Sequence, residues 1–559
     1  MKIKSNLNFI EKIIEKEINN GFPIKKIKFR FPPEPNGYLH IGHIKAICLN
    51  FELGKKYNAP VNLRFDDTNP TTENDKYVRS IKNDILFLGF KWNKESYASD
   101  YFAILYKFAI ELIKKGFAYI DNQSKYIIQS QRKTSFEIGI NSINRNRSID
   151  ENIKLFEKMK NGFFKEGTCV LRAKINMNSS NMNMRDPIMY RILYKKHHKT
   201  GSKWCIYPTY DWTHGQCDYI EQISHSLCSL EFENKKPLYN WFLDKIPYNK
   251  KKIKPKQIEF SRLNISNTIT SKRKIKYLIE KNIIESWDDP RILTIQGLRK
   301  KGYTSNSLKN FIHKIGITKR NNIIDTSSLE YYIRKDLNKI SSRLMVVLHP
   351  IKLIIDNYPS DNVEWIKIKN NPEDPHSKYR KVPFSKTLYI EKTDFIEKIN
   401  EKNFFRLYIG NKVRLKGAYI IKANLVKKDY KGKIKEIHCI YYPDSKSGTK
   451  KIVNKKMIVK STLHWVSTKY YFPVEVNLYD ILFLKNENNI NDKNNFYKYI
   501  NPKSKNKIIA KAEPHIKESK VGDHLQFQRI GYFYVEKIYK NKIIVNETVS
   551  IKNKWNKNK

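Results

Sequence analysis

The chain has 559 residues, of which 40% are hydrophobic, so it exceeds the size of a single core and two to four folded domains are expected. Lys and Arg number 107 against 55 Asp and Glu, and the resulting formal charge of +52 indicates a polyanionic partner such as a nucleic acid. The chain is also rich in Lys, Asn and Ile, which A/T-rich codons specify, so codon bias accounts for part of this charge.

Cysteine usage and hydropathy exclude several classes of protein. The six cysteines form no C-x-x-C pair, no His cluster has zinc spacing, and no metal held by protein ligands is expected. Residues 1–20 carry three glutamates and have no signal-peptide core, and no window approaches 18 uninterrupted apolar residues. A reduced, cytoplasmic protein without a membrane span is therefore expected.

The first elements in chain order are an amphipathic helix over 5–20 and a strand over 27–31. The strand runs into Arg30-Phe-Pro-Pro-Glu-Pro-Asn-Gly-Tyr-Leu-His-Ile-Gly-His43, whose prolines exclude helix before the turn at Asn36-Gly37. Apolar residues then recur at helical spacing. This strand–turn–helix order can receive a phosphate on backbone N–H groups at the helix start. A capped helix start with solvated histidines fits the geometry equally well.

Val61–Phe65 is the next predicted strand, and it ends in the turn-rich cluster Asp66-Asp-Thr-Asn-Pro70. Ligands of open parallel sheets bind beyond such strand ends. Helices are predicted over 75–88 and 100–115. From about 101 to 209 the α/β rhythm is interrupted by a helix (151–160), a strand-like segment (168–174) and polar loops, which predicts a domain inserted between two halves of a sheet.

The remainder of the chain divides into a helical part and a β part. Helices are predicted over 215–227, 237–246, 273–281, 290–301, 304–314 and 327–336. After Pro350, period-2 strands are predicted over 412–425, 436–442, 456–466 and 531–538, with a hairpin at Lys431-Gly432. The polar run 485–507 is predicted to be a loop or a mobile insertion. Many short strands predict an all-β barrel region.

The motif at 30–43 and Arg64-Phe-Asp-Asp-Thr-Asn-Pro70 closely resemble class I aminoacyl-tRNA synthetases, specifically the glutaminyl-tRNA synthetases. The resemblance covers roughly residues 25–550 and continues through the blocks 203–211, 225–232, 259–264, 269–274, 287–291, 302–304, 413–419, 464–467 and 526–533. So many blocks in the same order exclude chance agreement.

The resemblance implies an α/β fold: a Rossmann-like parallel-sheet catalytic domain, an inserted acceptor-stem domain, a helical subdomain and two C-terminal antiparallel β-barrels. The implied domains are 1–100, the first half of the catalytic domain; 101–209, the acceptor-stem insertion; 210–262, the second catalytic half; 263–337, the signature-lysine loop and helical subdomain; 338–550, two β-barrels that bind the anticodon; and 551–559, a basic tail.

The implied reaction has two steps. The amino acid attacks the α-phosphate of ATP, which carries Mg²⁺, and the terminal ribose 2′-hydroxyl of the tRNA then takes the acyl group. Catalysis of such a displacement rests on positioning and cationic stabilisation. His40, His43 and Lys272 match the family's catalytic residues: the histidines donate hydrogen bonds to the ATP phosphates, and the lysine is a point charge for the phosphoryl anion.

The implied ATP-binding set is Glu34, Pro35, Asn36, His40, Ile41, Gly42, His43, Ile44, Lys45, Ala46, Ser229, Arg262, Leu263, Thr270, Ser271 and Lys272. Gly42 lets the adenine approach the backbone closely. Taken alone, Ser271–Lys274 would fit a solvated basic helix start. Thr270 departs from the Met or Leu usual in the family, while the lysine and serine are kept.

The implied glutamine-binding residues are Asp66, Tyr210, Arg30, Cys228 and Gln257. Asp66 matches the carboxylate that pairs with the substrate α-ammonium, although an Asx turn is the structural alternative. Tyr210 matches the reader of the side-chain amide, and Arg30 either lines the pocket or forms a structural ion pair. A glutamate site commonly has an Arg in the position of Cys228, so the uncharged thiol favours glutamine.

The implied tRNA-binding residues are Thr318, Lys319, Arg320, Arg343, Arg406, Arg414, Lys416, Gln526, Arg529 and Asn234. Such groups read splayed-out bases on their edges. Lys416 stands where an Arg is usual and loses bidentate geometry, and Asn234 stands where an acceptor-reading Asp is usual. For any single basic residue, a solvated surface charge is the structural alternative.

Three functions are therefore compared. The first is a glutamine-tRNA ligase that acts on tRNA(Gln), L-glutamine and ATP, and the resemblance implies a monomer. A glutamyl-tRNA synthetase of the eukaryotic or archaeal type is the second. A non-catalytic tRNA-binding relic is the third, and the presence of His40, His43, Asp66 and Lys272 argues against it.

Overall fold

The computed structural model describes residues 7–247, 249, 252–266, 268–397, 406–448, 459–484 and 496–551. These residues form two compact units: an N-terminal unit of 1–265 with 312–324, and a C-terminal unit of 266–311 with 325–559. The predicted basic tail beyond 551 and the first residues of the predicted strand 456–466 lie outside the described residues.

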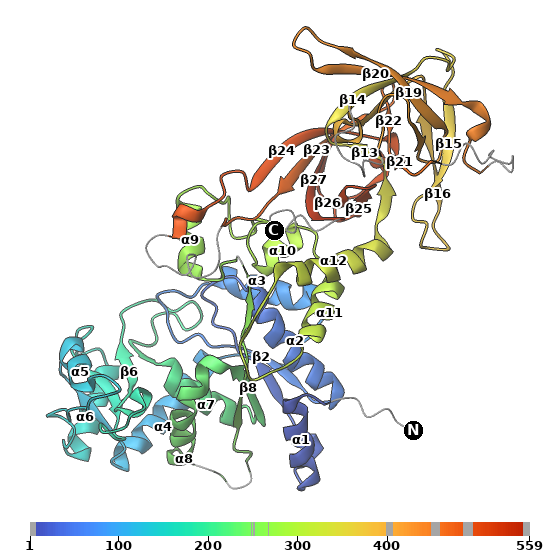
Figure 1. Cartoon of the computed structure of the whole chain (residues 1–559). Helices are drawn as coiled ribbons and strands as arrows, with labels where there is room; N and C mark the ends of the chain where they lie inside the picture. Colours follow the sequence, from blue (N-terminus) through green and yellow to red (C-terminus); the bar gives the residue numbers. More distant parts are fainter. Residues whose placement is uncertain are drawn as a thin grey trace. The chain divides into compact units, whose positions relative to one another are not determined.

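A parallel sheet forms the centre of the N-terminal unit (Figure 1). Strands β1 (Phe29–Phe31), β2 (Val61–Phe65) and β3 (Glu95–Tyr97) pair in parallel, as do β8 (His225–Ser229) and β9 (Lys256–Phe260). Strand β8 lies beside β1. The amide of Ser224, the residue before β8, donates to the carbonyl of Lys28, the residue before β1, at 3.1 Å. The order β3-β2-β1-β8-β9 confirms the Rossmann-like prediction.

Helices and an antiparallel insertion complete the N-terminal unit. The helices are α1 (Phe9–Asn19), α2 (Ile41–Lys56), α3 (Asp75–Phe87), α4 (Phe102–Lys114), α5 (Lys125–Arg132), α6 (Ile149–Lys160), α7 (Tyr210–Ile220) and α8 (Lys236–Lys245). Strands β4 (Ala118–Asp121), β5 (Val170–Ala173), β6 (Ile188–Ile192) and β7 (Ile206–Pro208) form one antiparallel sheet, and β10 (Leu263–Ile265) pairs with β11 (Asn322–Ile324).

One predicted helix of this unit is wrong. The helix expected over 215–227 is instead α7, which begins at Tyr210 and ends at Ile220, followed by strand β8 from His225. The interior of α7 from Trp212 to Tyr219 is buried on all sides, so it carries no amphipathic pattern.

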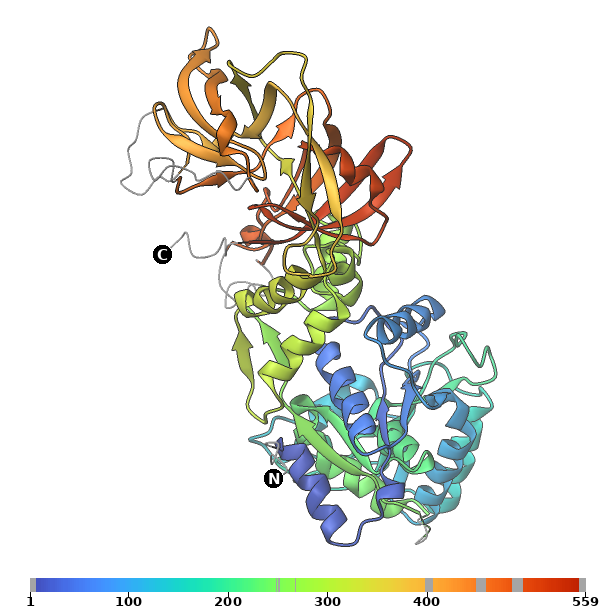
Figure 2. The same ribbon diagram turned by 90° about the vertical axis from the view of Figure 1, so that its right-hand side faces the viewer.

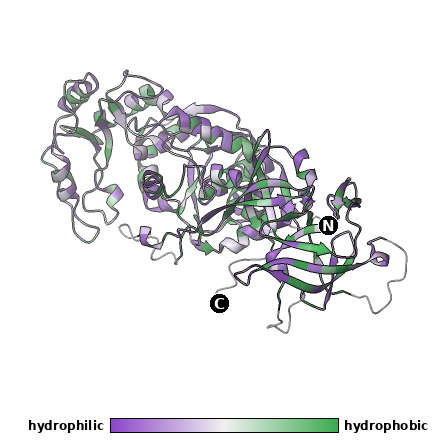
Figure 3. Ribbon diagram, turned by 90° about the horizontal axis from the view of Figure 1, so that it is seen from above, coloured by the Kyte–Doolittle hydropathy of each residue, from purple (hydrophilic) through white to green (hydrophobic). Residues whose placement is uncertain are grey.

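The C-terminal unit begins with α9 (Lys272–Glu280), α10 (Ile295–Lys300) and the start of α11 (Ser305–Ile315), and continues with α12 (Thr326–Ile340). Two seven-stranded sheets follow, which Figure 2 shows as separate curled ribbons in orange and red. None of the helices in the described ranges combines the length and the apolar character needed to cross a membrane. Figure 3 shows purple, hydrophilic residues interspersed with green ones along these helices.

The first barrel contains β14 (Pro350–Ile355), β17 (Thr387–Glu391), β18 (Lys412–Leu415), β19 (Ile420–Lys428), β20 (Ile434–Tyr442), β21 (Thr462–Leu463) and β22 (Val466–Ser467), and β15 (Glu364–Lys369) pairs with β16 (Tyr379–Phe384). Its edge strands β21 and β22 are separated in the chain by only two residues, so the sheet curls until its edges meet.

The second barrel contains β12 (Ser342–Leu344), β13 (Val346–Val347), β23 (Phe472–Tyr479), β24 (Lys505–Ala512), β25 (His524–Phe527), β26 (Gly531–Tyr539) and β27 (Lys542–Ser550). Only Met345 separates its edge strands β12 and β13, so this sheet curls in the same way. The barrel prediction is confirmed, with one refinement: β12–β25, β23–β27, β14–β20 and β18–β21 pair in parallel. The predicted loop 485–507 is wrong from Phe496 onward, where a 3₁₀ turn and β24 are found.

Candidate active site

The two histidines of the opening motif are held by the start of α2. His40 is the N-cap residue, and its Nδ1 accepts a hydrogen bond from the Gly42 amide at 3.1 Å. His43 Nδ1 accepts one from the His40 amide, also at 3.1 Å, and the two rings lie 4.1 Å apart. Since both Nδ1 atoms accept, each neutral ring carries its proton on Nε2. The site therefore offers two N–H donors at a helix N-terminus, where anions bind.

Gly42 is required by the close approach of the His40 ring. A Cβ atom at this position would lie 2.8 Å from His40 Cε1 and 3.9 Å from the Leu263 carbonyl oxygen. The first distance is too short for any real contact, so a side chain here would displace the N-cap histidine. This packing is a second reason for glycine, beside the approach of a base expected from the sequence.

Lys45 joins α2 to the end of β9. Its ammonium donates to the Ser261 carbonyl at 2.8 Å and to the Ser261 hydroxyl at 2.9 Å, and burial lowers the pKa of Lys45 to about 8. The amine is thus used to fix Ser261, which immediately precedes the predicted ATP residues Arg262 and Leu263. Arg262 itself pairs with Glu231.

The other predicted ATP residues fall in two places. Glu34, Pro35, Asn36, Ile41, Ile44, Ala46 and Ser229 lie in the N-terminal unit, with Ser229 at the carboxyl end of β8. Thr270, Ser271 and Lys272 lie in the C-terminal unit, where Ser271 is the N-cap residue of α9 and Lys272 its first residue.

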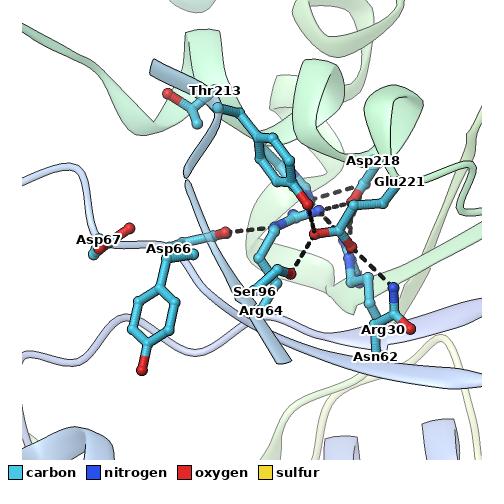
Figure 4. A network of polar contacts seen from close by, with 12 residues as sticks. Arg30, Asn62, Arg64, Asp66, Asp67, Ser96, Thr213, Asp218 and Glu221 are labelled. Carbon is cyan, nitrogen blue, oxygen red and sulfur yellow. Dashed lines mark hydrogen bonds and ion pairs between the residues drawn. The ribbon is translucent and has the colours of Figure 1, made fainter. Parts of the chain in front are cut away.

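A buried network of charges underlies the predicted amino-acid pocket (Figure 4). Asp218 of α7 accepts from Arg30 Nε at 3.1 Å and from Arg64 Nη1 at 2.8 Å, and all three side chains are fully buried. Burial opposes the charge of Asp218, but the two guanidinium groups hold its pKa far below the usual range. Arg30 also donates to the Ser226 hydroxyl and the Leu227 carbonyl. This arrangement favours the structural ion-pair alternative for Arg30.

Asp66 follows β2 and points into this network. Its Oδ1 accepts from Arg64 Nε at 2.8 Å, whereas its Oδ2, like Arg64 Nη2, is buried and has no hydrogen-bond partner within the described chain. Burial raises the pKa of Asp66 to about 6 against the attraction of Arg64. Unpaired buried polar atoms are costly, so this oxygen is suited to a cationic ligand.

Of the remaining predicted glutamine-binding residues, Tyr210 and Cys228 lie near this network, and Gln257 contacts Phe232, whose ring lies 5.6 Å from that of Tyr210. The Tyr210 hydroxyl lies within electrostatic reach of Asp66, Arg30 and Cys228. Cys228 on β8 is 9% exposed, and burial raises the pKa of its thiol to about 12, so it is uncharged. Gln257 is buried and donates through Nε2 to the Phe232 carbonyl at 3.1 Å and to Glu259 at 3.0 Å.

A histidine pair that the sequence analysis missed fixes the turn after Asp66. Asp67, His197 and His198 each bring one potential metal-ligand atom within 4.8 Å of the others. His197 Nδ1, however, accepts from the amides of Lys199 and Thr200, so its Nε2 carries the proton and donates to the Asp67 carbonyl at 3.0 Å. In this tautomer His197 offers no lone pair to a metal.

His198 completes the clamp on the turn. It hydrogen-bonds to the carboxylates of Asp67 at 3.1 Å and Asp75 at 2.8 Å, and these bonds raise its pKa although burial opposes them. Asp67 also accepts from the amide and hydroxyl of Ser99. The loop between β6 and β7 is thereby tied to the residue next to Asp66. Two adjacent histidines carried no recognisable spacing signal in the sequence.

Glu73, in the same turn, is expected to make stability depend on pH. Burial raises its pKa to about 8, and its Oε2 is buried without a hydrogen-bond partner among the described residues. The folded state thus holds a proton that the unfolded state releases near its ordinary pKa of 4.5. Stability should fall as pH rises from about 4.5 to 8. In thermal melts between pH 5 and 8.5, E73Q should remove this decline in stability. E151Q, which changes an exposed glutamate, should keep it. If the stability of wild type and of E73Q fell in parallel with pH, Glu73 would not be the cause.

The predicted tRNA residues occupy three regions. Thr318, Lys319 and Arg320 are exposed, and the Thr318 carbonyl accepts from the Ser261 amide at 2.8 Å. The Asn234 carbonyl accepts from the side chains of Asn181 and Asn183 in the insertion. Arg343, Lys416, Gln526 and Arg529 line one cavity of about 310 Å³ in the C-terminal unit, together with Pro372, Thr462 and Gln528.

Two predicted arginines lie outside the lining of this cavity. Arg414 donates to the Ser445 carbonyl at 2.7 Å and to the Ser447 hydroxyl at 3.1 Å. Arg406 donates to the Thr393 carbonyl at 2.6 Å and lies 3.5 Å from the Asp394 carboxylate, which Arg529 also contacts.

The Rossmann-like sheet with a histidine-capped helix, followed by two barrels, defines a class I aminoacyl-tRNA synthetase. Family models agree: residues 26–339 match the catalytic domain of class I (E and Q) tRNA synthetases, and residues 341–442 and 462–536 match two anticodon-binding domains of the same class. The chain belongs to this family of class I (E and Q) tRNA synthetases, and its full-length relatives are glutamine--tRNA ligases.

The relatives match over nearly their whole length. The glutamine--tRNA ligase of Buchnera aphidicola subsp. Schizaphis graminum is 50% identical over 99% of this chain and 98% of its own. That of Clostridium kluyveri is 46% identical over 98% of both chains. A solved glutamate tRNA ligase from Elizabethkingia meningosepticum aligns with a TM-score of 0.42 and 15% identity, over 56% of this chain and 70% of that chain.

Proposed function

We propose that this chain activates L-glutamine with ATP to glutaminyl-adenylate and transfers the glutaminyl group to the 2′-hydroxyl of the terminal adenosine of tRNA(Gln). AMP and pyrophosphate are released. The observation that carries this proposal is the full-length similarity to glutamine--tRNA ligases. We also propose that the enzyme acts as a cytoplasmic monomer.

The residues of the site suit adenylate formation. The Nε2–H groups of His40 and His43 donate to phosphate oxygens, and Lys272 stabilises the negative charge that develops as the glutamine carboxylate attacks the α-phosphorus. Mg²⁺ carried by ATP would supply charge neutralisation for the phosphates. The helix start presents N–H donors rather than carboxylates, so it suits phosphate oxygens rather than a metal ion.

The proposed glutamine pocket has a charged group for the α-ammonium of the substrate and uncharged or neutralised groups around its side-chain amide. The buried Asp66 oxygen pairs with the α-ammonium group, and the Tyr210 hydroxyl reads the side-chain amide. Around the amide, Cys228 is uncharged, and Arg30 is already neutralised by Asp218. A glutamate γ-carboxylate would enter this buried space without a free cation, which is unfavourable.

The outer parts of the chain hold the tRNA. The insertion 101–209, with Asn234 beside it, takes the acceptor stem, and the loop with Thr318, Lys319 and Arg320 contacts the tRNA as well. The barrels take the anticodon, whose bases are read on their edges by four residues that line one cavity: Arg343, Lys416, Gln526 and Arg529.

The deciding experiment is charging of tRNA(Gln) and tRNA(Glu) transcripts with radiolabelled glutamine or glutamate. Glutamine should be attached to tRNA(Gln) with a kcat/KM at least about 10³-fold above that for glutamate. A site built to hydrogen-bond the glutamine amide rejects glutamate strongly, because polar groups buried in the pocket would then be left unpaired. Preferred charging with glutamate would establish the glutamyl alternative, and charging with neither would establish the relic.

Replacing Cys228 by arginine should shift this preference. A guanidinium group in place of the thiol supplies the cation that the γ-carboxylate of glutamate needs. The side-chain amide of glutamine, in contrast, loses the uncharged thiol beside it. We expect C228R to lower kcat/KM for glutamine by about 10- to 100-fold and to raise that for glutamate. The conservative C228S should keep the wild-type preference. An unchanged ratio in C228R would show that Cys228 does not face the side chain.

A further inference from the structure

The cavity between the barrels is built around an arginine in an unusual conformation. Arg529 has φ of 69°, the left-handed region that few residues other than glycine adopt. It follows β25 of the second barrel, and its side chain lines the cavity with Arg343, Lys416 and Gln526. Strained backbone at such a place persists only when its surroundings hold it.

A single carboxylate holds this arginine. Asp394, in the 3₁₀ turn after β17 of the first barrel, accepts from Arg529 Nη1 at 2.5 Å and from Nη2 at 2.8 Å. Asp394 is 2% exposed, whereas the Arg529 side chain is 33% exposed. A bidentate pair fixes the plane of the guanidinium group, so its remaining N–H donors have defined directions.

The same carboxylate also serves a second predicted anticodon residue. Arg406 Nε lies 3.5 Å from Asp394 Oδ1, and Arg406 Nη1 donates to the carbonyl of Thr393, the residue before Asp394. His464, from the first barrel, lies 3.3 Å from Arg529 Nη1. Asp394 thus separates two guanidinium groups that would otherwise repel each other, and it joins the second barrel to the first.

We propose that Asp394 is a positioning residue for anticodon discrimination: it presents the Arg529 guanidinium to an RNA base in one orientation and orders Arg406 beside it. This inference rests on the proposed function, since it assumes that the cavity receives a base of tRNA(Gln). Asp394 is not itself among the residues expected to touch the tRNA, because its carboxylate would repel the phosphates.

A purely electrostatic role predicts the opposite effect. Asp394→Asn raises the charge of the site by one unit and keeps the shape of the side chain. If only charge mattered, D394N would bind every tRNA more tightly, because phosphate attraction is independent of sequence. If positioning matters, D394N binds tRNA(Gln) less tightly and loses discrimination, while tRNAs with a changed anticodon are bound as well as before or better.

The test measures glutamine charging by the full-length protein on tRNA(Gln) and on transcripts with one anticodon base changed. For D394N we expect KM for tRNA(Gln) to rise by about 10-fold, kcat at saturating tRNA to stay within about threefold, and the penalty for at least one changed base to shrink by about 10-fold. E397Q is the matched control, because Glu397 follows in the same segment and forms an exposed pair with Lys428; it should behave as wild type.

A second variant keeps the proposal testable if D394N folds poorly because Arg529 is left unpaired. D394N/R529Q removes both charges. At the base that Arg529 reads, its discrimination should equal that of R529Q alone, since at that base Asp394 and Arg529 act through one contact. Unchanged discrimination in D394N, tighter binding of all tRNAs, or additive losses at that base in the double variant would each overturn the proposal. Absence of glutamine charging by the wild type would instead overturn the proposed function.

Discussion

Replacing Lys272 by alanine is expected to lower the rate of glutaminyl-adenylate formation by about 10²- to 10³-fold, the usual loss when one preorganised charge-stabilising donor is removed. Lys272 is the first residue of α9, and its predicted partner is the α-phosphoryl group at the moment its negative charge develops. Because this charge exists mainly in the transition state, KM for ATP should change far less than kcat. Single-turnover formation of the adenylate in the presence of tRNA(Gln) measures the effect.

The control for this experiment lies on the same helix. Lys276 is one turn further along α9, is 73% exposed and pairs only on the surface with Glu280. K276A removes the same charge from the same element and should leave the rate unchanged. K272R should recover only part of the loss, because a planar guanidinium does not reproduce a compact ammonium. An adenylate rate in K272A equal to that of wild type would remove Lys272 from the mechanism.

Local sequence patterns predicted the helices and strands that have one apolar and one polar face. The strand at 61–65 has the predicted bounds, and the helices expected over 75–88 and 100–115 are found as α3 and α4 within two residues at either end. Helix α7 failed because Trp212 to Tyr219 is buried on all sides, which leaves no polar face to set a period. Strand β24 failed for the opposite reason: its exposed, lysine-rich residues are ordered by pairing with β23, which composition cannot show.

The site shows the same division. The contacts of the opening motif are local, because the N-cap histidine and Gly42 act within a few residues of one another. The proposed amino-acid pocket depends on contacts far apart in the sequence: Asp218 joins Arg30, 188 residues away, and Arg64, 154 residues away. Neither Asp218 nor the His197–His198 clamp belongs to a spacing pattern, so only the folded chain reveals them.

Replacing Asp66 by asparagine is expected to lower kcat/KM for glutamine by about 10²- to 10³-fold, since breaking a buried charged pair costs about 3–5 kcal/mol. Asparagine keeps the shape and the contact with Arg64, which retains its second partner Asp218 at 2.8 Å. The substrate ammonium, however, loses its counter-charge. KM for ATP and affinity for tRNA(Gln) should stay near wild type. D244N, an exposed carboxylate of α8 that pairs with Lys254, is the control.

The pH dependence separates this role from a structural one. The pKa of Asp66 is about 6, so the wild-type carboxylate becomes protonated as pH falls below that value and glutamine should bind less tightly. In D66N no proton is taken up, and kcat/KM for glutamine should be low and flat across the same range. If Asp66 only stabilised the turn, D66N would instead lower the melting temperature, and the pH dependence of glutamine binding would keep its wild-type shape. A wild-type profile for D66N would therefore assign the ammonium to another group. A flat one would tie glutamine binding to Asp66, whose buried Oδ2 has no hydrogen-bond partner among the described residues.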